Sequence, residues 1–396
     1  MRPDVLSHRP VGIRWFPHAM RAHWLHFILD RYLLLPLGAA VALIWANTDP
    51  EQYFTLAHRL AFPVNEIGMA LFLGLVTQEI VEAVMPGGAL HGWRRWTVPL
   101  IGAAGGLMGA YAIFLAFVYW KQEAVLLIGW PVAGAIDLAA GYYVLKTIFR
   151  GRSALTFLLL LSVASNAVGI VVLAVWPALT PDHIVAAAIL VAAVAFAAML
   201  KRARIRAFWP YVIGCGTASW WAFYWAGVHP ALALVPIVPF LPHQPRPLEV
   251  LAEPPDDGPV HHAEHRWNVA VQIVLFLFGL VNAGVILRGY DTGTWAVLLA
   301  ALVGRPLGVM AAIAIAVVAG LHLPRRTSWR DLAVVALATS SGFTFSLFVA
   351  TSLIPVGAVL TQLKLGALST VAGAGLAYGT ARVLRVGRFA REPARR

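Results

Sequence analysis

The chain has 396 residues, of which 60% are hydrophobic and only 12% charged, and its mean hydropathy is +0.75. A soluble fold of this composition would expose very large apolar patches to water, so the composition excludes an ordinary water-soluble enzyme and indicates a membrane protein. The single cysteine, Cys215, excludes an internal disulfide framework, and the formal charge of +12 is not arranged as the aromatic-lined basic groove that nucleic acid requires.

Twelve apolar segments follow one another along the chain, most of them near the roughly 20 residues that cross a bilayer as a helix. They cover about 28–47, 67–86, 97–119, 126–145, 154–175, 183–200, 208–225, 229–241, 267–287, 293–320, 331–353 and 359–381, the eighth being short. Residues 1–27 are polar, aromatic and basic and lack a signal-peptide cleavage site, so they are predicted to form a cytoplasmic arm.

The basic residues predict the orientation. Nearly all of the 30 Lys and Arg residues fall on one side of the membrane if the N-terminus is cytoplasmic, and the opposite side holds only Arg59, Lys121 and Arg288. The positive-inside rule therefore predicts a multi-pass protein of the bacterial inner membrane, with both termini in the cytoplasm. The same basic excess predicts affinity for anionic lipids and no nucleic-acid partner.

The predicted transmembrane domain covers residues 28–384 and is followed by a basic cytoplasmic tail, 385–396. One long connection, the cytoplasmic loop 242–266, separates the eighth and ninth spans and is rich in Pro, Asp, Glu and His. Its His261-His262-x-x-His265 cluster has the residue types of a metal site, but a solvated loop imposes no coordination geometry. We therefore expect neither a metal nor a cofactor.

Ionisable side chains inside the bilayer are costly, so each is a hypothesis about function. Asp137 lies near the middle of the fourth span, and Arg305 lies deep in the tenth. Glu79 and Glu82 lie toward the cytoplasmic end of the second span, three residues apart and hence on one helix face. Lys364, near the start of the twelfth span, is expected to snorkel to the membrane interface.

Two spans contain signals for a break. Pro131 and the glycines around it precede Asp137 in the fourth span, and the hydroxyl-rich stretch 339–344 interrupts the eleventh. Two interrupted spans in corresponding positions indicate the midplane site of a secondary transporter. A structural alternative stays open, in which Asp137 and Arg305 only compensate the partial charges of the broken helix ends.

An ordered set of short motifs carries a resemblance. The motifs are Trp45-Ala46-Asn47, Asn65-Glu66, Leu71-Phe72, Gly129-Trp130-Pro131 with Asp137, Gly227-Val228-His229, Asn282-Ala283-Gly284-Val285, Gly304-Arg305-Pro306-Leu307-Gly308, Ser341-Gly342-Phe343-Thr344-Phe345-Ser346 and Lys364-Leu365-Gly366. On these residues the chain resembles the bacterial NhaA-type sodium/proton antiporters from about residue 33 to 382. The resemblance implies an all-α integral membrane protein with about twelve transmembrane helices, built from inverted repeats, with broken crossing helices at the fourth and eleventh spans.

The chain departs from this family at the ion site. The family's fifth span carries an adjacent pair of aspartates, and the matching positions here are Asn166 and Ala167. The lysine of the family's tenth span is matched by Arg305, whose guanidinium stays protonated. Asp137 is then the sole acid at the midplane, and an asparagine offers a neutral oxygen that cannot titrate.

Three functions remain open. The first is a cation/proton antiporter with an altered site, in which Asp137 is the carboxylate, Asn166, Ser165 and Thr344 are neutral ligands, and Arg305 is nearby. The second is a non-transporting subunit or sensor in a membrane complex, and the third is a carrier of another solute, such as an anion. An enzyme is not expected, because the spans hold no nucleophile and base set.

The partners expected from the first function are monovalent cations and protons, with Glu79 and Glu82 in the cytoplasmic funnel that leads to the site. The sequence leaves open a homodimer or a partner in a membrane complex.

Overall fold

The computed structural model of the protein describes residues 34–86, 93–134, 139–149, 153–175, 183–205, 207–242, 259–287, 289–323 and 327–390. These residues form helices, turns and extended connections, with no strand among them. The α-helices are α2 (Leu34–Thr48), α3 (Pro50–Phe62), α4 (Met69–Val84), α5 (Trp93–Lys121), α6 (Trp130–Gly134), α7 (Ala139–Phe149), α8 (Ser153–Val175), α9 (His183–Arg202), α10 (Gly216–Ala226), α11 (Pro259–Asn282), α12 (Thr292–Leu299), α13 (Arg305–Val318), α14 (Trp329–Ala338), α15 (Thr344–Leu353), α16 (Ala358–Ser369) and α17 (Ala372–Val383).

Several helices are long and apolar enough to cross a membrane. Within the described residues, length and composition identify five such helices: Pro50–Val84, Trp96–Lys121, Ile184–Arg202, Thr292–Val318 and Ala358–Phe389. Shorter apolar helices accompany them. The prediction of an all-helical membrane protein is therefore confirmed for this part of the chain.

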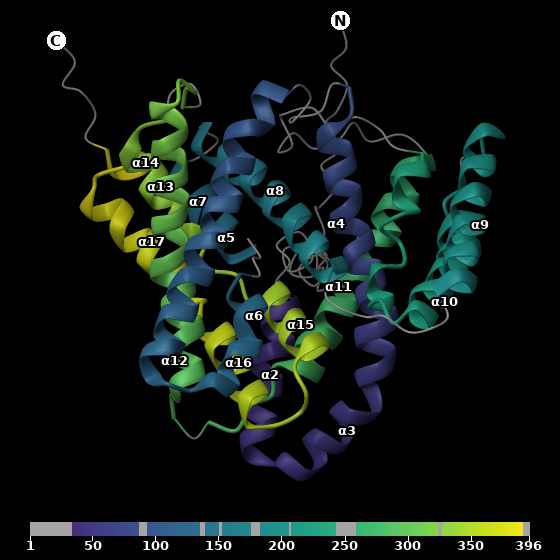
Figure 1. The fold of residues 1–396 in the computed structure, drawn as a ribbon, viewed down its shortest axis with the longest axis horizontal. Helices are drawn as coiled ribbons and strands as arrows, with labels where there is room; N and C mark the ends of the chain where they lie inside the picture. Colours follow the sequence, from purple (N-terminus) through teal and green to yellow (C-terminus); the bar gives the residue numbers. More distant parts are fainter. Residues whose placement is uncertain are drawn as a thin grey trace, which may run out of the picture.

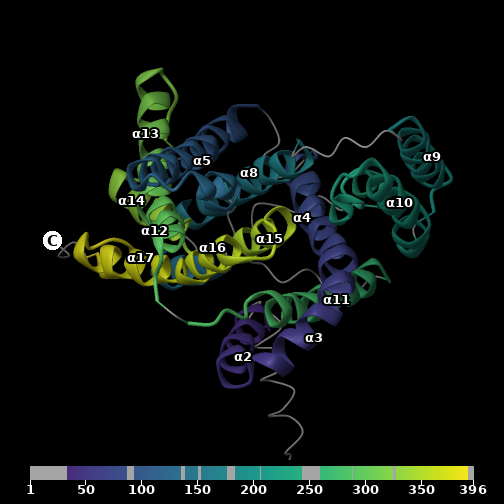
Figure 2. The ribbon, with the colours of Figure 1, turned by 60° about the horizontal axis from the view of Figure 1, so that its bottom comes forward.

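The helices form a bundle with two distinguishable ends (Figure 1). At one end, here called the α3 end, lie α3 and the connections next to α12 and α16. At the other, here called the α14 end, α13 ends and α14 begins. Long neighbours in the bundle are α5 with α13 and α2 with α11, while α9 and α10 pack on each other at one side (Figure 2).

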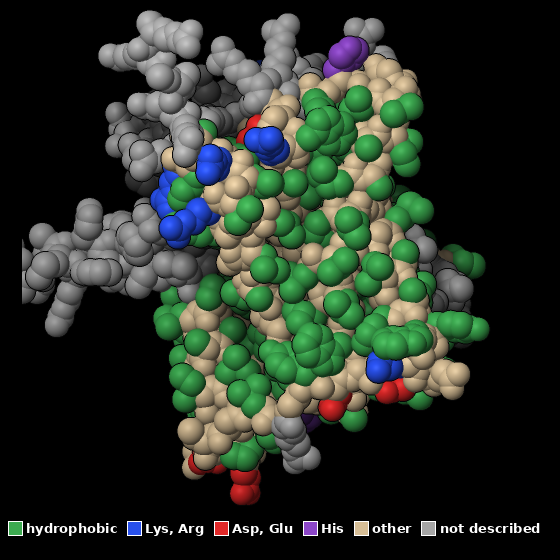
Figure 3. All heavy atoms as spheres, turned by 90° about the vertical axis from the view of Figure 1, so that its left-hand side faces the viewer, with side chains coloured by type: hydrophobic (Ala, Val, Ile, Leu, Met, Phe, Trp, Pro, Cys, Tyr) green, Lys and Arg blue, Asp and Glu red, His purple; other side chains and the backbone are tan. Residues whose placement is uncertain are grey.

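The surface matches a protein surrounded by lipid. On the face in Figure 3, hydrophobic side chains cover the wide band between the two ends, while Lys and Arg gather mostly toward the α14 end and Asp and Glu mostly at the α3 end. An apolar band of this kind is stable in hydrocarbon, whereas water would make it an aggregation surface.

The first and second spans are joined by a helix rather than by the predicted outside loop. Helix α3 begins after Asp49, whose side chain accepts the backbone N–H of Gln52 at 3.2 Å, and Pro50 occupies its first turn. Both are favourable helix starts. A π-helical turn, Pro63–Gly68, then joins α3 to α4, so Arg59 lies on a helix.

The ninth span differs from its prediction at both ends. Helix α11 begins at Pro259, so residues 259–266, expected in the long loop, are helical. It ends at Asn282 instead of residue 287, and residues 283–287 are extended.

Side chains from α2 and α3 explain this early end, because they satisfy the backbone after α11. The hydroxyl of Tyr53 accepts the N–H of Gly284 at 3.0 Å and donates to the carbonyl of Leu280 at 2.9 Å. Asn47 accepts the N–H of Leu287 and donates to the carbonyl of Val285, each at 2.9 Å. Extended backbone is tolerated at this depth because every one of these groups has a protein partner.

The eighth span, predicted as short, contains no α-helix. Residues 229–241 form turns and two 3₁₀ segments, Pro230–Leu232 and Val238–Phe240. Pro230, Pro236 and Pro239 each remove a backbone N–H from this stretch, which prevents a continuous α-helical ladder. The predicted arm 1–27, most of the loop 242–266 and the end of the tail lie outside the described residues.

Candidate functional site

The eleventh span is interrupted where its sequence predicts a break. Helix α14 ends at Ala338, residues 339–343 are not α-helical, and α15 begins at Thr344. Hydroxyl groups satisfy carbonyls near the break: Thr339 Oγ1 donates to the carbonyl of Ala336 at 2.6 Å, and Ser341 Oγ donates to that of Ala338 at 2.7 Å. The whole stretch from Thr339 to Ala350 is buried.

The fourth span begins with a 3₁₀ segment, Ala124–Gly129, that leads into α6, described from Trp130 to Gly134. The described chain resumes with α7 at Ala139. Asp137, the acid singled out by the sequence, lies outside the described residues.

Arg305 connects the fourth and eleventh spans. It is the first residue of α13, directly after the π-helical turn Ala300–Gly304, and its side chain is only 1% exposed. One terminal nitrogen, Nη2, donates to the carbonyl of Gly134 at 2.6 Å, and the other, Nη1, donates to the carbonyl of Thr339 at 3.2 Å. Its Nε has no hydrogen-bond partner among the described residues.

The two carbonyls come from different spans. Gly134 belongs to α6 of the fourth span, and Thr339 caps α14 at the break in the eleventh. A carbonyl at a helix C-terminal end, such as that of α14, carries part of a negative charge of about half a unit, so it stabilises a cation beside it. Arg305 is therefore a fixed positive charge shared by the fourth and eleventh spans.

Tyr111 on α5 is a neighbour of this centre that the sequence analysis does not single out. A Cβ placed on Gly134 would lie 2.5 Å from its hydroxyl oxygen, so the tyrosine ring packs directly on the end of α6. The ring also meets Trp130 edge to face, with centroids 4.7 Å apart and planes at 86°. Tyr111 thus holds α6 from the side, close to the Gly134 carbonyl.

The position of Arg305 depends on a close contact between α5 and α13. A Cβ on Gly308 would lie 2.1 Å from the carbonyl oxygen of Gly105, and one on Gly109 would lie 2.3 Å from that of Gly304. Gly105 and Gly109 of α5 therefore face Gly304, directly before α13, and Gly308 within it. On each side the two glycines are four residues apart, the spacing that lets membrane helices touch backbone to backbone.

The neutral candidates lie on the neighbouring helices. Ser165 on α8 is buried and Asn166 is partly exposed, while Thr344 opens α15 and is 1% exposed. Gly169 of α8 packs against the ring of Phe345, since a Cβ there would lie 2.8 Å from the ring. The Asn166 turn of α8 therefore runs past the start of α15.

The two acids of the second span lie in the last turns of α4. Glu82 is 2% exposed and accepts a hydrogen bond of 2.7 Å from Gln78 Nε2, while Glu79 is partly exposed. Neither shares a hydrogen bond with Arg305 in the described part of the chain.

A further acid faces a histidine near the α3 end. Glu66 Oε2 lies 3.7 Å from Nδ1 of His229, a residue that the sequence shows only as an isolated histidine. Because Nδ1 already accepts the N–H of Ala231 at 3.2 Å, the imidazole does not donate to the carboxylate from that nitrogen.

Comparison with known proteins identifies the family of the chain. The family model described as Na+/H+ antiporter 1 matches residues 30–381. The chain belongs to this antiporter family. It is 37% identical to a protein of Geobacter metallireducens named Na(+)/H(+) antiporter NhaA, over 91% of this chain and 98% of that one. A Pelobacter propionicus relative, named Na(+)/H(+) antiporter NhaA 2, is 37% identical over the same shares, and a Desulfitobacterium hafniense NhaA is 34% identical over 91% and 96%.

Membership of the sodium/proton antiporter family confirms the resemblance stated from the motifs. The structure brings Arg305 together with Gly134 of the fourth span and Thr339 of the eleventh, and it shows no hydrogen bond between Arg305 and Glu79 or Glu82 among the described residues. The roles of Asp137, Asn166, Ser165 and Thr344 stay predictions. Tyr111 and the facing glycines were missed, although the spacing Gly105-x-x-x-Gly109 is a readable signal for helix contact.

Proposed function

We propose that this family member exchanges a monovalent cation, sodium in the first place, for a proton at a site with one carboxylate. Asp137 is the titrating group, and Asn166, Ser165 and Thr344 supply neutral oxygens. Hard cations prefer oxygen ligands, and an acid that alternates between a proton and a cation gives exchange. With one acid, the site carries at most one proton per cycle.

The observation that carries this proposal is the bonding of Arg305. Its two terminal nitrogens are already committed to the carbonyls of Gly134 and Thr339, which compensate its charge. In this proposal the two backbone carbonyls, and not Asp137, bind the terminal nitrogens of the guanidinium. Asp137, three residues after Gly134 in the chain, is then free to titrate. An arginine does not release a proton under physiological conditions, so Arg305 acts as a fixed cation in place of the family's lysine.

The same bonding gives less support to an anion carrier. A carrier of anions needs donors aimed at its ligand. Here both Nη groups of Arg305 point to backbone carbonyls, and only Nε stays without a partner in the described residues.

The antiporter scaffold of two broken, crossing helices is also part of the proposal. Its support is the packing of α6 on α15 and of α7 on α14, which sets each half of the fourth span against the opposite half of the eleventh. We place this scaffold in a set of about twelve transmembrane helices with inverted repeats.

We infer that the α14 end faces the cytoplasm of a bacterial inner membrane and that the α3 end faces outward. The concentration of Lys and Arg toward the α14 end, visible in Figure 3, supports this orientation. The basic end is then the surface for anionic lipids. A homodimer or a membrane-complex partner remains a hypothesis of the same kind.

The test is cation-driven dissipation of a pH gradient in everted membrane vesicles, with sodium, lithium and potassium compared. Asp137→Asn is expected to abolish the response. The matched control is Glu51→Gln, which removes an exposed acid in the first turn of α3 and is expected to keep the response.

Two outcomes would contradict the proposal. If Asp137→Asn keeps the response, as the control does, Asp137 is not the carboxylate. If folded, inserted wild-type protein responds to no cation, the result favours the non-transporting subunit. A second readout is stoichiometry, because exchange of one proton for one cation is electroneutral. Clamping the membrane potential at zero should therefore leave the rate unchanged.

A further inference from the structure

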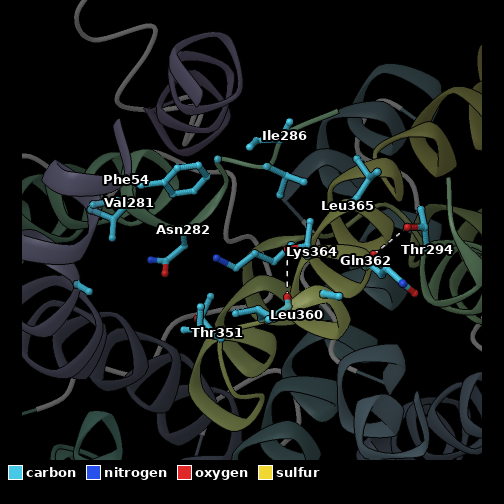
Figure 4. A pocket seen from close by; sticks show the side chains of 18 of the residues that line it. Phe54, Val281, Asn282, Ile286, Thr294, Thr351, Leu360, Gln362, Lys364 and Leu365 are labelled. Atoms are coloured by element: carbon cyan, nitrogen blue, oxygen red, sulfur yellow. Dashed lines mark hydrogen bonds between the residues drawn. The ribbon is translucent and has the colours of Figure 1, made fainter. Parts of the chain in front are cut away.

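A large cavity opens at the α3 end, away from Arg305. It has a volume of about 710 Å³ and lies between α3, the end of α11 with the extended segment after it, α12, α15 and α16. Figure 4 shows Lys364 of α16 reaching into this space, with its ammonium group directed toward Asn282. Its ammonium has no hydrogen bond or ion pair with any residue in the part of the chain that the structure describes.

The hydroxyl groups of the cavity wall offer lone pairs rather than hydrogens. Thr294 Oγ1 donates to the carbonyl of Gln362 at 3.0 Å, Thr351 Oγ1 donates to that of Leu347 at 3.0 Å, and Thr361 Oγ1 donates to that of Gly357 at 3.2 Å. Since a hydroxyl has one hydrogen and two acceptor lone pairs, each of these oxygens is left as an acceptor.

The amide groups of the wall have the same character. Asn65 and Asn282 donate to each other's side-chain oxygens, at 3.2 and 2.7 Å, and Asn282 Nδ2 also donates to the carbonyl of Phe278 at 3.1 Å. Asn282 is 3% exposed. The amide hydrogens are therefore partly used within the wall, while each Oδ1 keeps a second lone pair.

We propose that this cavity is a second cation site, for a monovalent alkali cation, and that the ammonium of Lys364 occupies it as a tethered competitor. Oxygen acceptors are what such a cation requires, and they are also what an ammonium requires. Asp291 lines the same cavity and adds a carboxylate to its wall. An anion would meet these oxygens unfavourably.

This site shares no residue with the centre around Arg305 and does not depend on whether that centre transports. If Lys364 competes in this way, the cavity binds cations weakly while Lys364 is charged and more tightly when that charge is removed. A sphere of 710 Å³ has a radius of roughly 5.5 Å, so a bound cation and the ammonium lie about that far apart. Even with the dielectric constant of bulk water, removing that repulsion tightens binding about fourfold.

The experiment measures cation-dependent thermal stability of the purified protein in detergent. Sodium, lithium and potassium chloride are titrated against choline chloride at constant ionic strength, and all variants carry Asp137→Asn so that the central carboxylate does not contribute. Lys364→Gln is expected to lower the half-saturating sodium concentration by about fourfold or more. The control is Lys121→Gln, a lysine of the same end whose ammonium lies over the Trp120 ring at 4.5 Å, and no change is expected there.

An unchanged half-saturating concentration in Lys364→Gln would overturn the proposal. A stabilisation that sodium chloride gives and sodium gluconate does not, and that disappears in Lys364→Gln, would also overturn the proposal, because that result identifies an anion site. If the glutamine variant does not fold, Lys364→Met removes the charge at similar length and Lys364→Arg keeps it, with the same contrast expected. Anomalous density for rubidium in the cavity of crystals of the neutral variant is a direct check, and its absence at saturating rubidium would also refute the site.

Discussion

The contact between α5 and α13 predicts a strong effect for one added methyl group. In Gly308→Ala the new Cβ would lie 2.1 Å from the carbonyl oxygen of Gly105. Ordinary van der Waals contact needs about 3.4 Å, so the two helices must separate by roughly 1.3 Å. Arg305 lies one turn before Gly308 on α13, and its hydrogen bond to the carbonyl of Gly134 has a length of 2.6 Å. A shift of that size lengthens this bond beyond the normal range.

The magnitude follows from three contributions. Overpacking costs about 1 to 3 kcal/mol, and a lost hydrogen bond to a charged group costs about 1.5 to 3 kcal/mol. The better helix propensity of alanine offsets about 1 kcal/mol. We therefore expect Gly308→Ala to destabilise the protein by about 1.5 to 5 kcal/mol.

The assay is thermal unfolding in detergent, followed by tryptophan fluorescence, with Gly379→Ala as the matched control. Gly379 lies on α17, and an added Cβ there meets nothing within 4 Å. The control is expected to melt at or slightly above the wild-type temperature, because alanine stabilises an uncrowded helix position by about 0.5 to 1 kcal/mol. Equal melting temperatures for Gly308→Ala and Gly379→Ala would refute the close contact and its link to Arg305.

Three further substitutions test other contacts. Arg305→Lys keeps the charge but lacks the planar fork that reaches two carbonyls, so it should melt between the wild type and Arg305→Met; a lysine variant as stable as wild type would contradict the two-carbonyl bridge. Tyr53→Phe removes the acceptor of the buried Gly284 N–H and should cost about 1 to 3 kcal/mol in thermal unfolding, and an unchanged melting temperature would show that the extended segment does not depend on it. Ser328→Ala breaks the reciprocal capping of α14 by Ser328 and Asp331, costs about 1 kcal/mol, and should speed hydrogen exchange in the first turn of α14. Unaltered exchange in that turn would mean that the cap is dispensable.

Some features follow from local chemistry, and the sequence predicts them well. The apolar composition predicts a helical membrane protein, because a bilayer accepts only backbone that is hydrogen-bonded internally. The hydroxyl-rich stretch 339–344 predicts a break in the eleventh span, and Arg305 stands out because a charge deep in a span is rare. Each of these signals is contained in fewer than about 20 neighbouring residues.

Other features were predicted incorrectly because a distant segment decides them. The ninth span reads as apolar to residue 287, yet it ends at Asn282, since Tyr53 and Asn47 satisfy the backbone of the residues that follow. That Lys364 snorkels to the interface stays a prediction, and only the structure shows the cavity that it points into, whose walls come from five helices. Hydropathy cannot distinguish these cases, because it reports the cost of a side chain in lipid and not the partners available to it.

The sequence by itself determined that the chain lies in a membrane, which family it resembles, and which residues are costly there. Only the tertiary structure decided that Arg305 bonds the carbonyls of Gly134 and Thr339, residues 171 and 34 positions away from it in the chain. The physical reason is that a buried cation is stabilised by whichever backbone carbonyls the packing of the helices brings to it. That packing depends on whether two backbones can touch, as they do where Gly308 meets Gly105.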